Sequence, residues 1–219
     1  MRILRSPTFA FAGLLAGASL ISGCGKPTGY QQADRTGADL AQFREELVNG
    51  KEAIDATMKA LGQVVVTATT DPRPAFEQYS RAVANLEATA AQARKRSQDM
   101  KEHGDAYFAQ WEKQLAEVRN ETIRNLAVTR RAKLKDAFNT IAKVAEPLKA
   151  QFDPWMSDLK DLQKYLANDL TLAGVDSAKA LIAKTRADGV QVQKSLDDLI
   201  AELNTVAATL TPAAATGDR

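Results

Sequence analysis

The sequence has very few of the residues that carry metal and nucleophilic chemistry. Its 219 residues include one cysteine, Cys24, and one histidine, His103. A single cysteine excludes a disulfide within the chain and any zinc site built from several thiolates. A single histidine cannot supply the two Glu-x-x-His motifs of a di-iron bundle. We therefore expect no metal and no cofactor.

Catalytic motifs are missing as well. The sequence contains no glycine-rich phosphate loop, no Gly-x-Ser-x-Gly elbow and no His-Glu-x-x-His pair. Three carboxylate pairs occur, Glu45-Glu46, Asp158 with Asp161, and Asp197-Asp198. On polar helix faces such pairs are usually solvated charges. We expect a protein that is not an enzyme, with no catalytic residue.

Long apolar runs are absent except near the N-terminus. Arg2 and Arg5 precede an apolar run over residues 9–20. That run is shorter than the ~20 residues of a membrane-spanning helix and is typical of an export signal. It leads to Ile21-Ser22-Gly23-Cys24, which resembles a lipobox, where the cysteine thiolate takes a diacylglyceryl group. Residues 1–23 are thus predicted to be a lipoprotein signal peptide and Cys24 the lipidated residue; an ordinary secretory signal with a chance cysteine is the alternative.

Neither sign of charge dominates once this signal is removed. The net charge of +2 comes from the two arginines of the signal, so the chain from Cys24 onward has 27 basic and 27 acidic side chains. A neutral chain indicates no nucleic-acid partner. Gly25 stands where an aspartate would resemble an inner-membrane retention signal. We therefore expect a lipid anchor, palmitate included, in the inner leaflet of the outer membrane, with the domain facing the periplasm.

Two polar ends flank a long periodic region. Residues 24–37 are rich in glycine and polar side chains, which predicts a flexible tether with a root-mean-square reach of roughly 20 Å. Residues 211–219 predict a disordered tail. Residues 38–210 place apolar side chains at helical spacing, and no stretch alternates with the period of a strand. One all-α domain is predicted there.

Breaks in the periodicity divide this domain into four helices. The first break contains Pro72 and Pro74, and the second contains Asn120, a plausible N-cap. At the third, Gly174 is predicted to stop one helix and Asp176 to cap the next. Short connections require antiparallel neighbours. The fold class is therefore an elongated antiparallel helical bundle, or coiled coil, of four long helices.

The two middle helices are predicted to be the longest. A heptad seam predicts one helix from about Pro74 to Arg119, passing through Gly104. The next helix contains Pro147 and Pro154, each of which should kink it. Because the outer helices are shorter, the middle pair should form a hairpin that projects beyond them.

The tip of this hairpin, residues 111–138, is rich in charge. Its arginines make it a possible partner-binding surface, and we expect reversal of their charge to leave the fold intact. The alternative is a solvated helix face. The candidate partner-binding residues are Arg119, Arg124, Arg130 and Arg131.

The stretch from Tyr107 to Leu170 resembles a known family. The segments FAQWEKQL, RRAKLKDAFNTIAKVAEPLKAQF and LQKYLANDL are similar to those of bacterial lipoproteins grouped as domain of unknown function 2959. Members likewise carry a lipobox, a Trp-Glu pair before a turn and a Glu-Pro-Leu-like step. The resemblance implies a helical, coiled-coil-like fold and brings no established activity.

Two functional classes fit these features. The first is a structural or interaction lipoprotein, a cell-envelope scaffold that presents a helical hairpin to an envelope protein, with self-association as a further possibility. The second is a binding module for lipid or another small amphiphile, held in space that the kinks near Pro147 and Pro154 open between helices.

Overall fold

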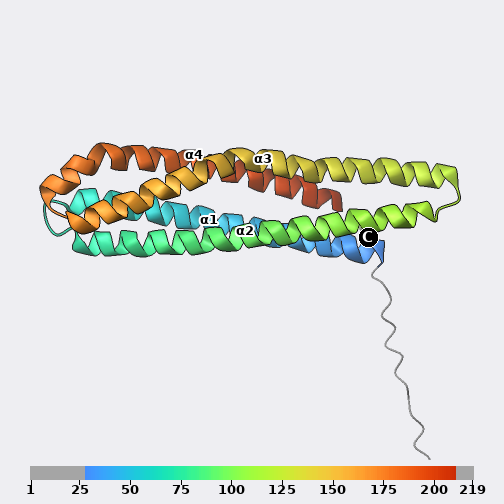
Figure 1. Cartoon of the computed structure of the whole chain (residues 1–219), viewed down its shortest axis with the longest axis horizontal. Coiled ribbons are helices and arrows are strands. Elements are labelled where there is room, and N and C mark those ends of the chain that lie inside the picture. The colour runs from blue at the N-terminus through green and yellow to red at the C-terminus, as the bar shows by residue number, and fades with distance from the viewer. Residues whose placement is uncertain (1–27, 211–219) are drawn as a thin grey trace, which may run out of the picture.

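The computed structural model describes residues 28–210, and its regular structure over that range is entirely helical. Loops of three to five residues join the helices, so consecutive helices run antiparallel (Figure 1). Each helix packs on the next, and the last closes the ring onto the first. The predicted all-α antiparallel bundle is confirmed. Its elements are α1 (Gly29–Thr67), α2 (Arg73–Ala116), α3 (Glu121–Asn168) and α4 (Leu172–Leu210).

The two middle helices have the continuity that the sequence predicts. α2 passes unbroken through Gly104, whose Cα faces the Phe138 ring of α3 so closely that a Cβ would lie 3.2 Å from it. α3 contains Pro147 and Pro154 within one helix, and Figure 1 shows it bending in its middle. The α2–α3 hairpin reaches past the start of α1 and the end of α4 (Figure 1). The projecting hairpin is therefore present.

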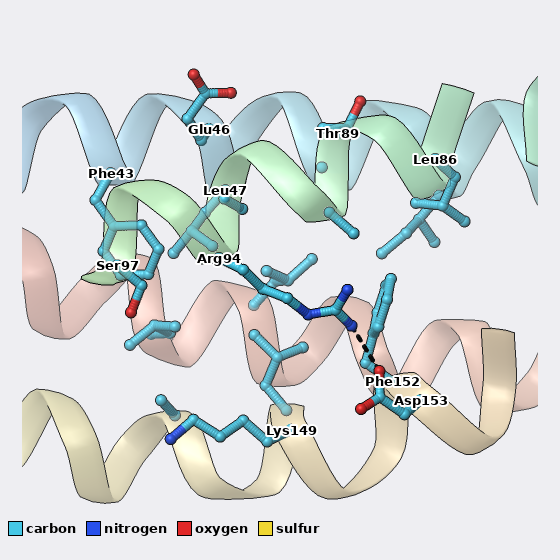
Figure 2. A pocket seen from close by; sticks show the side chains of 18 residues that line it. Phe43, Glu46, Leu47, Leu86, Thr89, Arg94, Ser97, Lys149, Phe152 and Asp153 are labelled. Carbon is cyan, nitrogen blue, oxygen red and sulfur yellow. Dashed lines mark hydrogen bonds and ion pairs between the residues drawn. The ribbon is translucent and has the colours of Figure 1, made fainter. Parts of the chain in front are cut away.

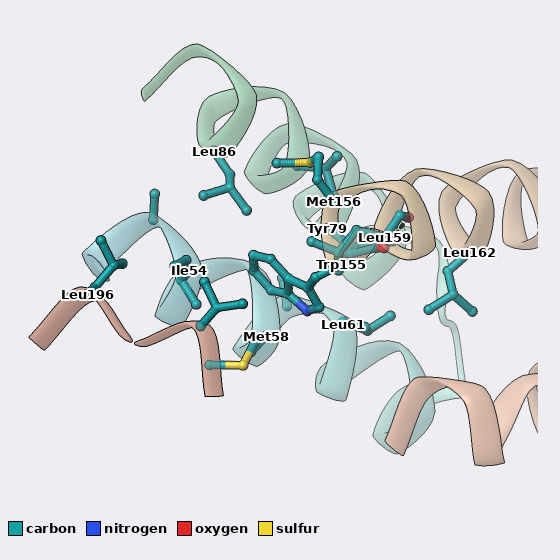
Figure 3. Packing of buried hydrophobic residues seen from close by; sticks show 14 of the residues in the cluster. Ile54, Met58, Leu61, Tyr79, Leu86, Trp155, Met156, Leu159, Leu162 and Leu196 are labelled. Atoms are coloured by element: carbon teal, nitrogen blue, oxygen red, sulfur yellow. Dashed lines mark hydrogen bonds between the residues drawn. The ribbon is translucent and has the colours of Figure 1, made fainter. Parts of the chain in front are cut away.

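The core is a layer of apolar side chains with two large polar-tipped anchors. The Tyr79 hydroxyl donates to the Leu159 carbonyl at 2.6 Å, which ties α2 to α3. The Trp155 indole N–H donates to the Thr185 carbonyl at 2.7 Å, which ties α3 to α4. Both side chains are buried, and Figure 3 shows them among Leu and Met side chains of α1, α2 and α3. A satisfied polar tip lets a large ring stay buried without leaving a donor unpaired.

The first helix begins earlier than predicted. Helix α1 starts at Gly29, so the prediction of a flexible tether is wrong for residues 29–37. The Gln31 side chain accepts from the Thr28 backbone N–H at 2.9 Å, one half of a capping box. Gln32 then donates to Gln110 of α2 at 2.8 Å, and Thr36 is buried. Packing against α2 thus holds a polar, glycine-containing segment in helical form.

The start of α4 also differs from the prediction. Thr171, not Asp176, caps this helix, because its hydroxyl accepts from the Gly174 N–H at 3.1 Å. Gly174 lies in the first turn of α4 instead of ending α3. A Cβ on this glycine would overlap the Asp169 side chain, so the close approach of the loop requires glycine here.

Candidate functional site

The predicted lipidation site lies outside the described residues. This holds for Cys24 and for the preceding Ile21, Ser22 and Gly23. The structure nevertheless places the point at which the chain enters the bundle. Gly29 lies beside Gln114 of α2, because a Cβ on this glycine would lie 3.6 Å from the Gln114 side-chain oxygen. The start of α1 is therefore at the same end of the bundle as the hairpin tip (Figure 1).

The turn at the tip is closed by two side chains. The Asn120 side chain accepts from the Ile123 N–H at 3.1 Å, which confirms the predicted N-cap. Arg124 donates from Nε and Nη2 to the Val118 carbonyl, at 3.0 and 2.5 Å. Arg124 thereby satisfies a carbonyl that the end of α2 leaves without a helical partner.

Two more arginines bind neighbouring helices. Arg131 donates to the Phe108 carbonyl at 3.2 Å and to the Glu112 carboxylate at 2.8 Å, and its side chain is only 19% exposed. Arg130 donates to the Thr209 carbonyl of α4 at 2.6 Å.

The structure brings all four predicted arginines to one end, with Arg119 exposed at the turn. Three of them donate to backbone carbonyls, which a glutamate side chain cannot do because an ionised carboxylate only accepts. Replacing Arg124, Arg130 and Arg131 by glutamate would remove these bonds, so the structure gives a reason to expect a loss of stability where the sequence predicts none.

Exposed apolar side chains accompany these arginines. Ile123, Leu126 and Val128 are 55%, 68% and 50% exposed. The sequence pattern places Ile123 on the buried seam of α3. Here, beyond the ends of α1 and α4, only α2 lies beside α3, so one helix face at most is covered. Three large aliphatic side chains within six positions of a charged segment were the sequence signal for this exposed apolar surface, but the prediction considered only the charges.

A second hydrophobic cluster supports the base of the tip. Tyr107, Phe108 and Leu134 form its buried centre, and Phe138 meets Phe108 edge-on with ring centroids 5.4 Å apart. Burial raises the pKa of the Tyr107 hydroxyl. Trp111 is partly buried against this cluster, with its ring centroid 5.5 Å from that of Tyr107. The tip is thus held on a rigid aromatic base.

A cavity lies midway along the bundle, beside the bend of α3. Its volume is about 160 Å³. Apolar side chains from all four helices line it. Those from α3 are Ala145, Leu148 and Phe152, which lie on either side of Pro147 and just before Pro154. This is the region where the sequence predicts space between helices. The apolar lining includes Phe43, Leu47, Leu86, Leu148, Phe152 and Leu196.

Charged side chains stand at the mouth of this cavity, between α2 and α3 (Figure 2). Arg94 pairs with Asp153 at 2.6 Å, and its guanidinium lies 5.5 Å from the centre of the Phe152 ring. Lys149 adds a second cation at the rim. Lys149 is itself paired with Glu146 at 3.0 Å, and Glu46 adds a carboxylate to the lining, so the apolar interior opens onto charges of both signs.

The remaining candidate residues are surface charges. His103 is exposed and shares a hydrogen bond with Asp39 at 2.7 Å. Asp197 pairs with Lys51 at 2.7 Å and Asp158 with Lys184 at 3.6 Å, each across two helices. Within residues 28–210, no cluster of three histidine, cysteine or acidic side chains is arranged to hold a metal ion. No helix in the same range is long and apolar enough to cross a membrane.

Comparison with known proteins gives one result. A search of curated proteins and a search of solved structures return no match. A family model matches residues 25–210, which includes every described residue and extends well beyond the stretch whose motifs resemble that family. Its description is a protein of unknown function, which leaves the activity open. The chain belongs to the DUF2959 family.

Proposed function

We propose that the protein is a lipid-anchored envelope lipoprotein that acts as a structural or interaction module and performs no catalysis. The observation that carries the proposal is the junction between anchor and fold. A lipobox-like Ile-Ser-Gly-Cys is followed, five residues after Cys24, by the first residue of a continuous helical bundle. Such a junction fixes a rigid body close to a membrane surface.

The dimensions of the bundle suit a spacer. The 48 residues of α3 correspond to a rod roughly 72 Å long. Anchored through Cys24, the rod would carry the loops 68–72 and 169–171 far from the membrane and keep the hairpin tip near it. We place the anchor in the inner leaflet of the outer membrane and the rod in the periplasm, because Gly25 follows the cysteine.

Acylation is tested by expressing the chain in a Gram-negative host fed an alkyne fatty acid. The wild-type protein should incorporate the label and sediment with outer-membrane fractions. The matched variant Cys24→Ser should lose both. Label-free wild-type protein released into the soluble periplasm would refute the anchor.

A protein partner is tested by cross-linking in cells. A photoreactive residue at exposed Arg119 samples the tip, and one at exposed Thr70 samples the opposite end. A scaffold should give a discrete cross-linked species from at least one end. If neither position gives a product above that of exposed Ala41 on the side of α1, the scaffold role is refuted. Sedimentation of residues 25–219 decides whether the chain pairs with itself.

A second candidate function, favoured by the cavity, is binding of a lipid or other small amphiphile. A cavity of about 160 Å³ is similar in size to an engineered apolar cavity of about 150 Å³ that takes up benzene. It would hold part of an acyl chain, with a polar head among the paired charges of Arg94, Asp153 and Lys149.

Native mass spectrometry of residues 25–219 tests this candidate. Co-purified lipid should be present in the wild type. Replacing Ala93, at the cavity wall, by leucine should displace it, while Ala41→Leu on an exposed face should not. Lipid-free wild-type protein that also takes up no added fatty acid would refute the candidate.

A further inference from the structure

The exposed apolar side chains at the tip need an occupant. Ile123, Leu126 and Val128 lie in the first two turns of α3, each at least half exposed. They stand beyond the aromatic cluster at the base of the tip, where neither α1 nor α4 covers the hairpin (Figure 1). Transfer of such exposed apolar side chains from water into any apolar phase lowers the free energy.

The short distance between Cys24 and the start of α1 indicates which apolar phase lies near the tip. Five residue steps separate Cys24 from Gly29, and an extended chain spans at most ~3.6 Å per step, so α1 begins within roughly 18 Å of the lipidated cysteine. This limit follows from covalent geometry alone. Whatever membrane holds Cys24 is therefore near the start of α1.

The tip extends further in the same direction. Gln32 of α1 is bonded to Gln110 of α2, so these residues are level in the antiparallel pair. From Gln110 to the turn at Val118 is eight residues, or roughly 12 Å of helix, whereas from Gln32 back to Gly29 is three, or roughly 4.5 Å. The turn thus passes the start of α1 by roughly 7–8 Å.

Charge at this end of the bundle favours a phospholipid surface. The tip, residues 111–138, has seven basic and four acidic side chains, although the chain from Cys24 onward is neutral as a whole. Clusters of basic residues are attracted to anionic leaflets, and an apolar helix face inserts about 5–10 Å into the boundary between headgroups and acyl chains. Ile123 and Leu126 lie two and five residues from the start of α3, or roughly 3 and 7.5 Å along its axis.

We propose that the hairpin tip is a membrane-contact site whose partner is the bilayer that holds Cys24. Ile123, Leu126 and Val128 enter the headgroup boundary, and exposed Arg119 meets lipid phosphates. The inference deepens the proposed function and rests on acylation of Cys24. Two contacts, the acyl chains and the tip, then set the orientation of the rod.

The experiment uses the acylated chain in vesicles of phosphatidylethanolamine and phosphatidylglycerol. Leu126→Cys carries a nitroxide at the tip, and Thr70→Cys carries one in the loop between α1 and α2 at the opposite end. Acylation blocks the chain's own cysteine, so each variant has one reactive thiol. Both positions are exposed, and circular dichroism should show wild-type melting for both.

The result expected is flotation of both proteins with the vesicles, with a severalfold higher ratio of oxygen to nickel-chelate accessibility at Leu126→Cys than at Thr70→Cys. If both proteins float but the two ratios are equal, the tip inference is wrong and the anchor stands. If the chain is not acylated and does not float, the anchor fails and the inference falls with it. If the tip label becomes protected only after envelope proteins are added, the partner is a protein and the membrane inference is overturned.

Discussion

Gly189 lies where α4 passes over Met58 and Trp155, and one added methyl group there probes the tightest packing in the core. A Cβ at this position would overlap the Met58 sulfur and lie 3.1 Å from Cζ2 of Trp155. Carbon atoms pack best at ~3.5–4.0 Å, so the neighbours must move by about 1 Å. Met58 can rotate, but the indole is held by its hydrogen bond to Thr185.

The magnitude follows from two opposing effects. Alanine is better than glycine in a helix by ~1 kcal/mol, and overpacking a filled core costs about 1–3 kcal/mol. We therefore expect Gly189→Ala to lower the free energy of unfolding by about 1 kcal/mol, or Tm by roughly 2–4 °C for a domain of this size. The matched control is Gly37→Ala in α1, where nothing lies within 4 Å of the new methyl group. It should raise the free energy of unfolding by about 0.5–1 kcal/mol.

Both variants are measured on residues 25–219 by urea titration and by thermal melting at 222 nm, with tryptophan fluorescence as a second probe. A Gly189→Ala protein as stable as the wild type would refute the close packing of α4 on α1 and α3. A Gly37→Ala protein with unchanged stability would show that residues 29–37 are not held in the helix.

Three further predictions concern other contacts. Burial raises the pKa of Tyr79, so its contribution to the free energy of unfolding is full below pH ~10. As the pH rises above ~10 this contribution is lost, by up to about 1.4 kcal/mol per pH unit. Tyr79→Phe should lower the free energy of unfolding by about 1 kcal/mol at pH 7, and urea titrations should show a shallower loss of stability at alkaline pH. Arg131→Gln removes hydrogen bonds to α2 and should lower the free energy of unfolding by about 1–2 kcal/mol. The control, Lys135→Gln at an exposed position, should change it by no more than about 0.5 kcal/mol. Equal melting temperatures for the two variants would contradict a structural role of Arg131. Pro147→Ala restores a backbone hydrogen-bond donor inside α3 and should raise Tm. A lower Tm would refute the view that Pro147 destabilises this helix.

The sequence was sufficient for the helices and for the direction that their side chains face. Helical spacing is a local property, so the positions of Val83, Leu86, Ile182 and Leu196 predict the buried face without knowledge of the partner helix. Chain direction follows from loop length, because short loops permit only antiparallel neighbours. The same reasoning fails at Ile123, where the spacing persists but the bundle has run out of neighbours to cover it.

Long-range contacts were beyond the sequence. Arginines 124, 130 and 131 carry the same charge in any conformation, and only the fold shows that they donate to carbonyls of neighbouring segments. The lining of the cavity could not be predicted either. The prolines predict a bend, but the residues that face the resulting space come from all four helices. The early start of α1 was partly visible, since Thr28 and Gln31 have capping-box spacing, yet the bond that retains this turn comes from Gln110.

That early start changes what the tip can do. Beginning at residue 38 after a tether of roughly 20 Å, the bundle could turn either end toward the membrane. The helix instead starts nine residues earlier, which moves its first residue roughly 13 Å along the axis toward the tip and leaves five residue steps to Cys24. If Cys24 is acylated, the hairpin tip, whose charge suggests a protein-binding surface, is the part of the bundle closest to the lipid. The loops at the opposite end are then the part of the rod farthest from the membrane surface.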